Sequence, residues 1–121
     1  MASDKVLGAK GEEIATAHLR KHGYRILHRN WIWNHKELDI VCQKDNLLIV
    51  VEVKTRANEA YERPQDAVTL KKQRNITEAT QAYMDTYQLE NEVRFDVISV
   101  LLDKQQKKLE HIQDAFHPIE L

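Results

Sequence analysis

Acidic and basic side chains recur at short, regular intervals between residues 36 and 56. The segment reads Lys-Glu-Leu-Asp-Ile-Val-Cys-Gln, then Lys-Asp-Asn, then Leu-Leu-Ile-Val-Val-Glu-Val-Lys-Thr-Arg. Two runs rich in Val, Ile and Leu flank an Asp-Asn pair, which is typical of a β-hairpin. With Asp45 and Asn46 as the turn residues, Lys44 faces Leu47 and the register of both strands follows.

This register predicts that charged side chains meet across the hairpin. Asp39 lies opposite Glu52 and Glu37 lies opposite Lys54, with all four on one face. Carboxylates directly across a strand pair, with Cβ atoms about 4.5–5.5 Å apart, repel each other and either raise one pKa or demand a cation. A divalent ion with oxygen ligands, above all Mg²⁺, removes the conflict, and Lys54 adds a positive charge. The pattern indicates a hydrolytic metal site, with a solvated charged sheet margin as the alternative.

Length and composition are those of one soluble domain spanning residues 1–121. No stretch has transmembrane length and the first residues lack a signal-peptide pattern, so we expect a cytoplasmic protein without a membrane partner. The single cysteine, Cys42, cannot form an internal disulfide and is expected to be a small buried apolar residue.

Charge is unevenly distributed along the chain. The net charge of −1 gives no global support for a nucleic-acid partner. Residues 1–74, however, hold 14 Lys and Arg against 10 Asp and Glu, whereas residues 75–121 hold 4 against 9. This asymmetry permits a basic face around an acidic centre, and a mixed, solvated surface is the alternative explanation.

Hydrophobic periodicity and turn residues predict the elements around the hairpin. We expect helices over residues 3–22 and 66–87, strands over 24–33 and 92–102, a short strand over 109–112, a loop over 56–66 and a tail from about 113. The second helix turns an apolar face inward, formed by Val68, Ile76, Ala79, Tyr83 and Tyr87. Gly8 and Gly11 cost the first helix roughly 1 kcal/mol each, which indicates close approach of another backbone or a substrate, or a later helix start.

The histidines do not form a recognisable zinc motif in the sequence. His18 and His22 have the i, i+4 spacing that lets one helix face offer two ligands to an ion. No third ligand has suitable spacing, and an exposed helix surface explains the pair equally well.

The order of several short motifs resembles the YraN-like family of small bacterial proteins. These motifs are Gly-x-x-Gly-Glu, Gly-Tyr-x-Ile-Leu, Glu-Leu-Asp-Ile, Val-Glu-Val-Lys-Thr-Arg and Lys-Gln-Arg, spread roughly over residues 8–100. That family is similar to Holliday-junction resolvases and other nucleases of the PD-(D/E)xK, restriction-endonuclease-like superfamily. The resemblance implies an α/β fold in which a central mixed sheet of four to five strands is flanked by helices, in the order α-β-β-β-α-β.

The resemblance also implies a catalytic set. Glu12 matches the glutamate of the first helix, Asp39 the acidic residue of the second strand, and Glu52 with Lys54 the Glu-x-Lys pair of the third. Asp39, Glu52 and the backbone carbonyl of Val53 would hold Mg²⁺ or Mn²⁺, and Glu12 would join through water or a second ion. Lys54 would orient or deprotonate the attacking water, or stabilise the transition state.

Further residues are expected to support this chemistry. Glu37 would hold Lys54 in place as its cross-strand neighbour. Phosphate contacts are expected from Arg56, Lys71, Lys72, Gln73 and Arg74, of which Lys72 and Gln73 match the family's Lys-Gln pair; an exposed helical surface is the alternative.

The function we expect is therefore a Mg²⁺- or Mn²⁺-dependent endonuclease that hydrolyses DNA phosphodiesters, with branched or otherwise structured DNA as the substrate. Similarity to resolvases further implies a homodimer, although the sequence shows no exposed apolar stripe. The alternative is a non-catalytic nucleic-acid-binding or protein-interaction module on the same fold.

Overall fold

A computed structural model describes residues 4–58 and 68–120 of the chain. The described residues form helices α1 (Asp4–Lys21) and α2 (Leu70–Tyr87) and strands β1 (Arg25–Trp33), β2 (Lys36–Lys44), β3 (Leu47–Arg56), β4 (Glu92–Leu102) and β5 (Lys107–Phe116). No helix in these ranges is long and apolar enough to cross a membrane.

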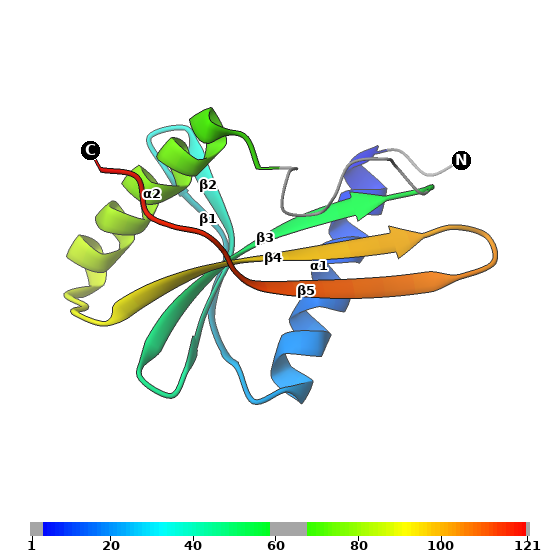
Figure 1. Ribbon diagram of the computed structural model, residues 1–121, viewed down its shortest axis with the longest axis horizontal. Coiled ribbons are helices and arrows are strands. Elements are labelled where there is room, and N and C mark those ends of the chain that lie inside the picture. The colour runs from blue at the N-terminus through cyan, green and yellow to red at the C-terminus, as the bar shows by residue number, and fades with distance from the viewer. Residues whose placement is uncertain (1–3, 59–67, 121) are drawn as a thin grey trace.

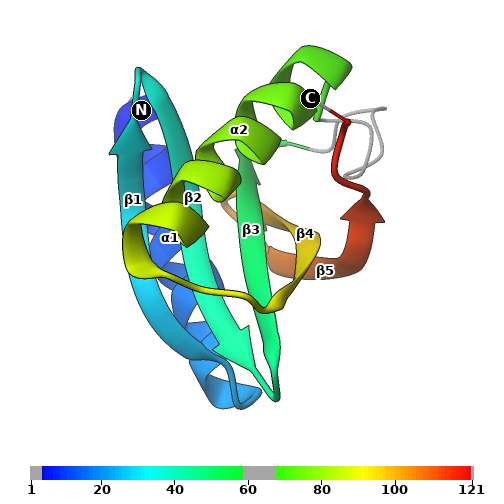
Figure 2. The same ribbon diagram turned by 90° about the vertical axis from the view of Figure 1, so that its left-hand side faces the viewer.

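The strands form one mixed sheet in the order β1-β2-β3-β4-β5 (Figure 1). Neighbouring strands are antiparallel except β3 and β4, which are parallel and are connected through α2. Figures 1 and 2 show the two helices on opposite faces of this sheet. The predicted α/β class, with a mixed sheet and a restriction-endonuclease-like order, is confirmed; a fifth strand completes the order as α-β-β-β-α-β-β.

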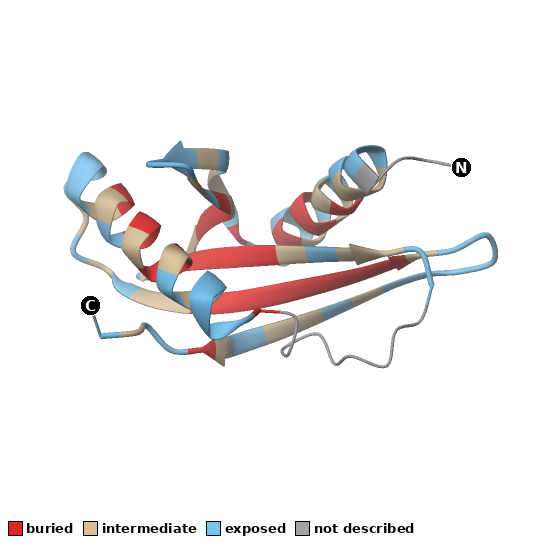
Figure 3. Ribbon diagram, turned by 90° about the horizontal axis from the view of Figure 1, so that it is seen from above, coloured by how far each residue is buried: buried red, intermediate tan, exposed pale blue. Residues whose placement is uncertain are grey.

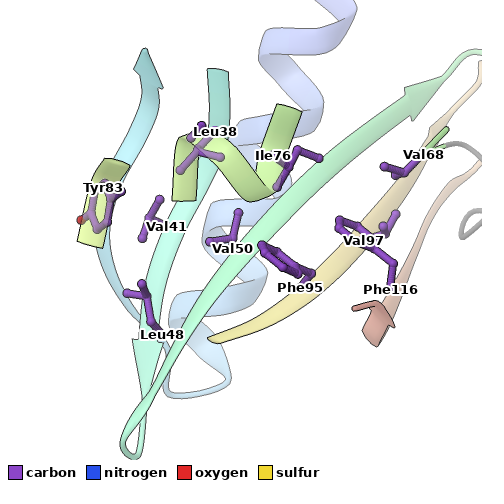
Figure 4. Close-up of a cluster of buried hydrophobic side chains, with 11 residues drawn as sticks. Leu38, Val41, Leu48, Val50, Val68, Ile76, Tyr83, Phe95, Val97 and Phe116 are labelled. Carbon is purple, nitrogen blue, oxygen red and sulfur yellow. The ribbon is translucent and has the colours of Figure 1, made fainter. Parts of the chain in front are cut away.

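The two faces of the sheet carry separate hydrophobic cores, and β3 and β4 run buried between them (Figure 3). Leu48 and Val50 of β3 face α2, in a cluster that Figure 4 shows with Ile76 and Tyr83 of the helix. Ile49 and Val51 point the other way, toward Ala15 and Leu19 of α1. Cys42 is fully buried on this second face, as expected.

The central hairpin has the predicted register for most of its length. Asp45, with φ of 55°, lies in the two-residue turn, and Lys44 pairs with Leu47. The ladder continues to Ile40 and Val51 and ends there. Beyond this point β2 and β3 run on without regular pairing, so the charged residues lie where the hairpin opens.

Local signals set the ends of the helices. Thr69 caps α2 because its hydroxyl accepts a hydrogen bond from the Lys72 N–H at 3.2 Å, and Gln88 ends the helix in the left-handed region. The helix therefore begins at Leu70, later than the predicted start at about residue 66, because Thr69 caps it. Most of the predicted 56–66 loop lies outside the described residues. Four of the five predicted inner residues are buried, but Tyr87 is 42% exposed.

The C-terminal region differs from the prediction. Instead of a short strand over 109–112 and a tail from 113, β5 extends from Lys107 to Phe116. Many of its residues are polar and exposed, so the sequence does not show the alternation of apolar and polar residues that marks a strand. At its C-terminal end Phe116 stacks on Phe95 of β4, with ring centroids 4.9 Å apart. Edge strands with polar outer faces are a common device against unwanted strand pairing.

Candidate functional site

Asp39 is held at the opening of the hairpin by the backbone of the next strand. Its Oδ2 accepts a hydrogen bond from the Val53 N–H at 2.9 Å, in place of the regular ladder that ends one residue earlier. The side-chain alternation of β2 also breaks here, since Leu38 and Val41 both face α2 whereas Ile40 faces α1. This irregularity directs the Asp39 carboxylate into the opening rather than into either core.

Glu52 lies beside Asp39 and is almost completely buried, with 4% of its side chain exposed. It continues the face of Leu48 and Val50, so it points toward the N-terminal turns of α2. There the Lys72 ammonium lies 3.7 Å from Glu52 Oε1. The second oxygen, Oε2, is buried and has no hydrogen-bond partner within residues 4–58 and 68–120.

Glu12 reaches the same opening from the other face of the sheet. With its amide oriented to satisfy its neighbours, Asn30 donates to Glu12 Oε1 at 2.7 Å and to Glu37 Oε1 at 3.2 Å. Asn30 belongs to β1 and lies opposite Asp39 of the neighbouring strand β2. Its φ is 54°, a conformation that Asn tolerates better than most residues. Asn30 is therefore the bridge that connects helix α1 to the hairpin.

The position of Glu12 depends on the close approach of α1 to β3. A Cβ added at Gly11 would lie 1.8 Å from Thr55 Oγ1, so only glycine permits this contact. Gly8, one turn earlier, borders the opening, and no atom of the described residues lies within 4 Å of a Cβ added there. A close approach therefore exists at Gly11, but it is made by a side chain of β3 and not by the backbone or substrate that the sequence predicted. At Gly8 the prediction of a nearby backbone is wrong within the described residues, because the space is open.

We call Glu12, Asp39 and Glu52 the acidic site. A pocket over it is lined by Leu7, Gly8, Glu12, Asp39, Val53, Lys54, Thr55 and Lys72. These residues come from both helices and from β2 and β3. The structure therefore brings the four predicted catalytic residues into one region: Glu12, Asp39 and the exposed Lys54 line the pocket, and the buried Glu52 lies behind the lining, next to Asp39 and Lys72.

Burial and mutual repulsion make ionisation of the acidic site unfavourable. Burial, reinforced by the Asp39 charge, raises the pKa of Glu52 to about 8, although Lys72 opposes the shift. Burial also raises the pKa of Asp39, against the Val53 hydrogen bond and Lys72. The pKa of Glu12 is raised by burial, then by Asp39 and Glu37. Full ionisation of the acidic site at neutral pH would therefore need positive charge beyond that of Lys72.

These properties fit a divalent cation with oxygen ligands. The Oε2 of Glu52 is buried with no hydrogen-bond partner among the described residues. The raised pKa of this carboxyl means that its charge is compensated either by a bound proton or by a cation. Within the described ranges no three His, Cys, Asp or Glu side chains are close enough to share one ion. Mg²⁺ does not need three, because it commonly keeps several waters beside one or two carboxylates.

Two details of the site differ from the sequence-based expectation. Glu37 and Lys54 are not paired across the hairpin, because the ladder ends before them, and Glu37 lies next to Asn30 instead. The ammonium next to Glu52 is that of Lys72, which had been assigned to phosphate contacts. Asn30 was missed altogether, since nothing in a strand sequence marks a residue with positive φ.

The other predicted phosphate-contacting residues surround the N-terminus of α2 and the end of β3. Lys71 and Arg74 are exposed, as is about half of the Lys72 side chain. Gln73 folds back, and its Nε2 donates to the Val68 carbonyl at 3.0 Å. Arg56 is partly buried, and one of its guanidinium nitrogens donates to Ser99 Oγ at 3.3 Å.

Sequence relatives identify the family of the chain. A family model described as "Uncharacterised protein family UPF0102" matches residues 11–100, most of the chain and all three members of the acidic site. The chain belongs to the UPF0102 family. The YraN-like resemblance is thereby confirmed.

UPF0102 relatives match the chain over nearly its whole length. It is 46% identical to a UPF0102 protein of Bacteroides thetaiotaomicron over 118 residues, which cover 98% of each chain. It is 48% identical to one of Phocaeicola vulgatus over 118 residues, again 98% of each, and 44% identical to one of Parabacteroides distasonis over 117 residues, 97% of each. These relatives therefore have about the same length as this chain.

Proposed function

We propose that this UPF0102 protein is a Mg²⁺- or Mn²⁺-dependent endonuclease acting on DNA. The observation that carries the proposal is the buried Glu52 carboxylate, which lies next to a second carboxylate, Asp39, at an opening accessible from solvent. One of its oxygens has no hydrogen-bond partner in the described part of the chain. Neighbouring carboxylates with this degree of burial destabilise the folded state, and they are typical of sites that bind metal or transfer protons.

Asp39, Glu52 and the Val53 carbonyl would hold the ion, and Glu12 would act through a bound water. A divalent ion bound there supplies positive charge to the scissile phosphate and lowers the pKa of a water molecule. Asp39 keeps its orientation through the Val53 N–H, so it is preorganised before the ion arrives. Lys54, exposed at the rim, is positioned to orient the attacking water or to stabilise negative charge that develops on the phosphate.

DNA would approach along the N-terminal turns of α2. Exposed Lys71, Lys72 and Arg74 present positive charge beside the pocket, and Arg56 extends the basic surface at the end of β3. Lys72 has a second role, because its ammonium also lowers the pKa of Glu52 and Asp39. Binding of DNA phosphates to Lys72 would therefore weaken its hold on Glu52 and favour the ion there.

The test is cleavage of labelled linear, flapped and four-way branched DNA with Mg²⁺ or Mn²⁺. Asp39→Asn keeps an acceptor for the Val53 N–H but removes the charge, so we expect at least about a 100-fold loss of cleavage rate. Glu90→Gln, at an exposed position away from the acidic site, is the matched control and should cleave normally. Absence of cleavage of all three substrates, or full activity in Asp39→Asn, would refute the proposal.

A second candidate is DNA binding without catalysis, favoured by the Lys72 ammonium that already compensates Glu52 in part. In that case binding would fall steeply with salt because Lys71, Lys72 and Arg74 release counterions from the duplex. Binding that is indifferent to chelator and to Asp39→Asn, with no cleavage, would favour this candidate over the nuclease.

A further inference from the structure

A second cluster of titratable groups lies under the C-terminal half of α1, apart from the acidic site. Asp96 of β4 is completely buried at its centre. It accepts two hydrogen bonds from the Arg94 guanidinium at 2.9 Å, one from His111 Nε2 at 2.8 Å and one from the Asp114 N–H at 3.0 Å. Burial opposes ionisation of Asp96, but the hydrogen bonds from His111, Arg94 and Asp114 prevail and lower its pKa.

This carboxylate fixes the tautomer of His111. Because ionised Asp96 can only accept, His111 Nε2 carries the proton, and in a neutral ring Nδ1 is left with its lone pair. A histidine whose second nitrogen donates to a carboxylate is the usual arrangement around protein-bound transition metals. The lone pair of His111 Nδ1 faces helix α1.

The helix supplies two more imidazoles at that place. His18 Nε2 lies 3.2 Å from His111 Nδ1. Two nitrogens that bind one ion at the usual 2.0–2.1 Å, with tetrahedral or octahedral angles, are separated by about 2.9–3.4 Å. The observed separation, which is also that of a hydrogen bond between the two rings, therefore suits two adjacent ligands of a single ion that would take the place of the shared proton.

His22 stands one turn after His18, and its ring lies 4.3 Å from that of His18. Its Nδ1 donates to the His18 carbonyl at 2.8 Å, which leaves Nε2 as an acceptor in the neutral ring. As the side chains stand, no three such groups in the described part of the chain converge on one point. His22 is exposed, so a side-chain rotation can bring it to an ion that His18 and His111 already hold.

We propose that His18, His22 and His111 form a binding site for a transition-metal dication such as Zn²⁺. Imidazole ligands select ions of this borderline-soft class over Mg²⁺, so the site would be chemically distinct from the acidic site. A bound ion would connect the C-terminal half of α1 to edge strand β5. The sequence offered only the His18 and His22 pair, and the fold supplies the third ligand 89 positions later in the chain.

The experiment is a titration of the purified full-length chain with Co²⁺, followed by its visible absorption, and with Zn²⁺ in competition with a chromogenic chelator. Mg²⁺ is present in large excess to occupy the acidic site. We expect one ion per chain, and at least about 10-fold weaker binding in His18→Gln and in His111→Gln. His117→Gln, at an exposed histidine just beyond β5, should bind like the unmodified chain. Circular dichroism establishes that each variant is folded.

His18→Gln is the decisive variant, because its side chain faces solvent in part and its loss leaves the Asp96 network intact. Equal affinity in the unmodified chain and in His18→Gln would overturn the proposal, as would the absence of any Co²⁺ binding. Asp39→Asn should leave Co²⁺ affinity unchanged. Loss of binding in Asp39→Asn alone would assign the ion to the acidic site and also overturn the proposal.

Discussion

Replacement of Glu52 by the neutral Gln should stabilise the protein at pH values above about 4.5, and not below. In the folded chain burial and Asp39 raise the pKa of Glu52 to about 8 from the ordinary value of 4.5. Between these values the folded state therefore binds more protons than the unfolded state. The contribution of Glu52 to the free energy of unfolding is therefore fully present below about pH 4.5 and is lost as the pH rises toward about 8. Glu52→Gln removes the ionisable group and with it this loss.

The size of the effect follows from the width of the window. Each pH unit within it costs the folded state about 1.4 kcal/mol, so the free energy of unfolding should fall by about 3 kcal/mol between pH 5 and pH 7 on account of Glu52. The 4% exposure of this side chain leaves little solvent to screen the effect. The stability difference between Glu52→Gln and the unmodified chain should therefore grow by about 3 kcal/mol over this range.

Urea unfolding at pH 5, 6 and 7 measures the difference, with the fluorescence of Trp31 and Trp33 as the probe. Glu90→Gln is the matched control, because the same substitution at this exposed position should leave the pH dependence of the unmodified chain in place. A difference between Glu52→Gln and the unmodified chain that does not change between pH 5 and pH 7 would refute the reasoning. Millimolar Mg²⁺ at pH 7 should narrow the difference, because an ion at the acidic site stabilises the ionised form.

Three further outcomes test the surrounding structure, each by urea unfolding. Gly11→Ala should destabilise the protein by about 1–3 kcal/mol because its Cβ would collide with β3, whereas Gly8→Ala, in open space, should stabilise it by about 0.5–1 kcal/mol; equal effects would contradict the close contact. Phe116→Ala should cost about 3 kcal/mol through loss of its stack on Phe95, and a cost near zero would mean that β5 ends earlier. Asn30→Ala should cost about 1–2 kcal/mol through backbone strain and lost hydrogen bonds, while glycine there should restore the backbone part; identical losses would exclude strain.

The hairpin was predictable because its turn residues and the two apolar runs that flank them agree. The Asp45-Asn46 turn determines the register, and the register then brings Asp39 next to Glu52 without any long-range information. The error at Glu37 and Lys54 arose from extending that register past the last regular pair. Where a strand pair ends depends on what packs around it, here α1 and Asn30, and a strand sequence does not carry that information.

Contacts between distant segments were the part that the sequence did not reveal. Lys72 was recognised as a cation near the site, but its pairing with Glu52 depends on how α2 lies across the sheet. His111 belongs to a strand whose polar face concealed its extent, so its meeting with His18 was invisible beforehand. Helix α2 itself was expected from its apolar face, which the buried Ile76, Ala79 and Tyr83 confirm.

The parallel pairing of β3 with β4 has a consequence for the order of folding. Every pair in this ladder joins residues 45 positions apart, from Leu47 with Glu92 to Arg56 with Leu101, whereas the β2–β3 hairpin closes over two residues. Local hairpins form in microseconds and distant strands pair later. Asp39 and Glu52 should therefore come together before α2 brings Lys72 next to them. Repulsion between these two carboxylates in the folding transition state should slow folding near neutral pH, so Glu52→Gln should refold faster in stopped-flow experiments. An unchanged refolding rate would mean that α2 and β4 are in place before the two carboxylates meet.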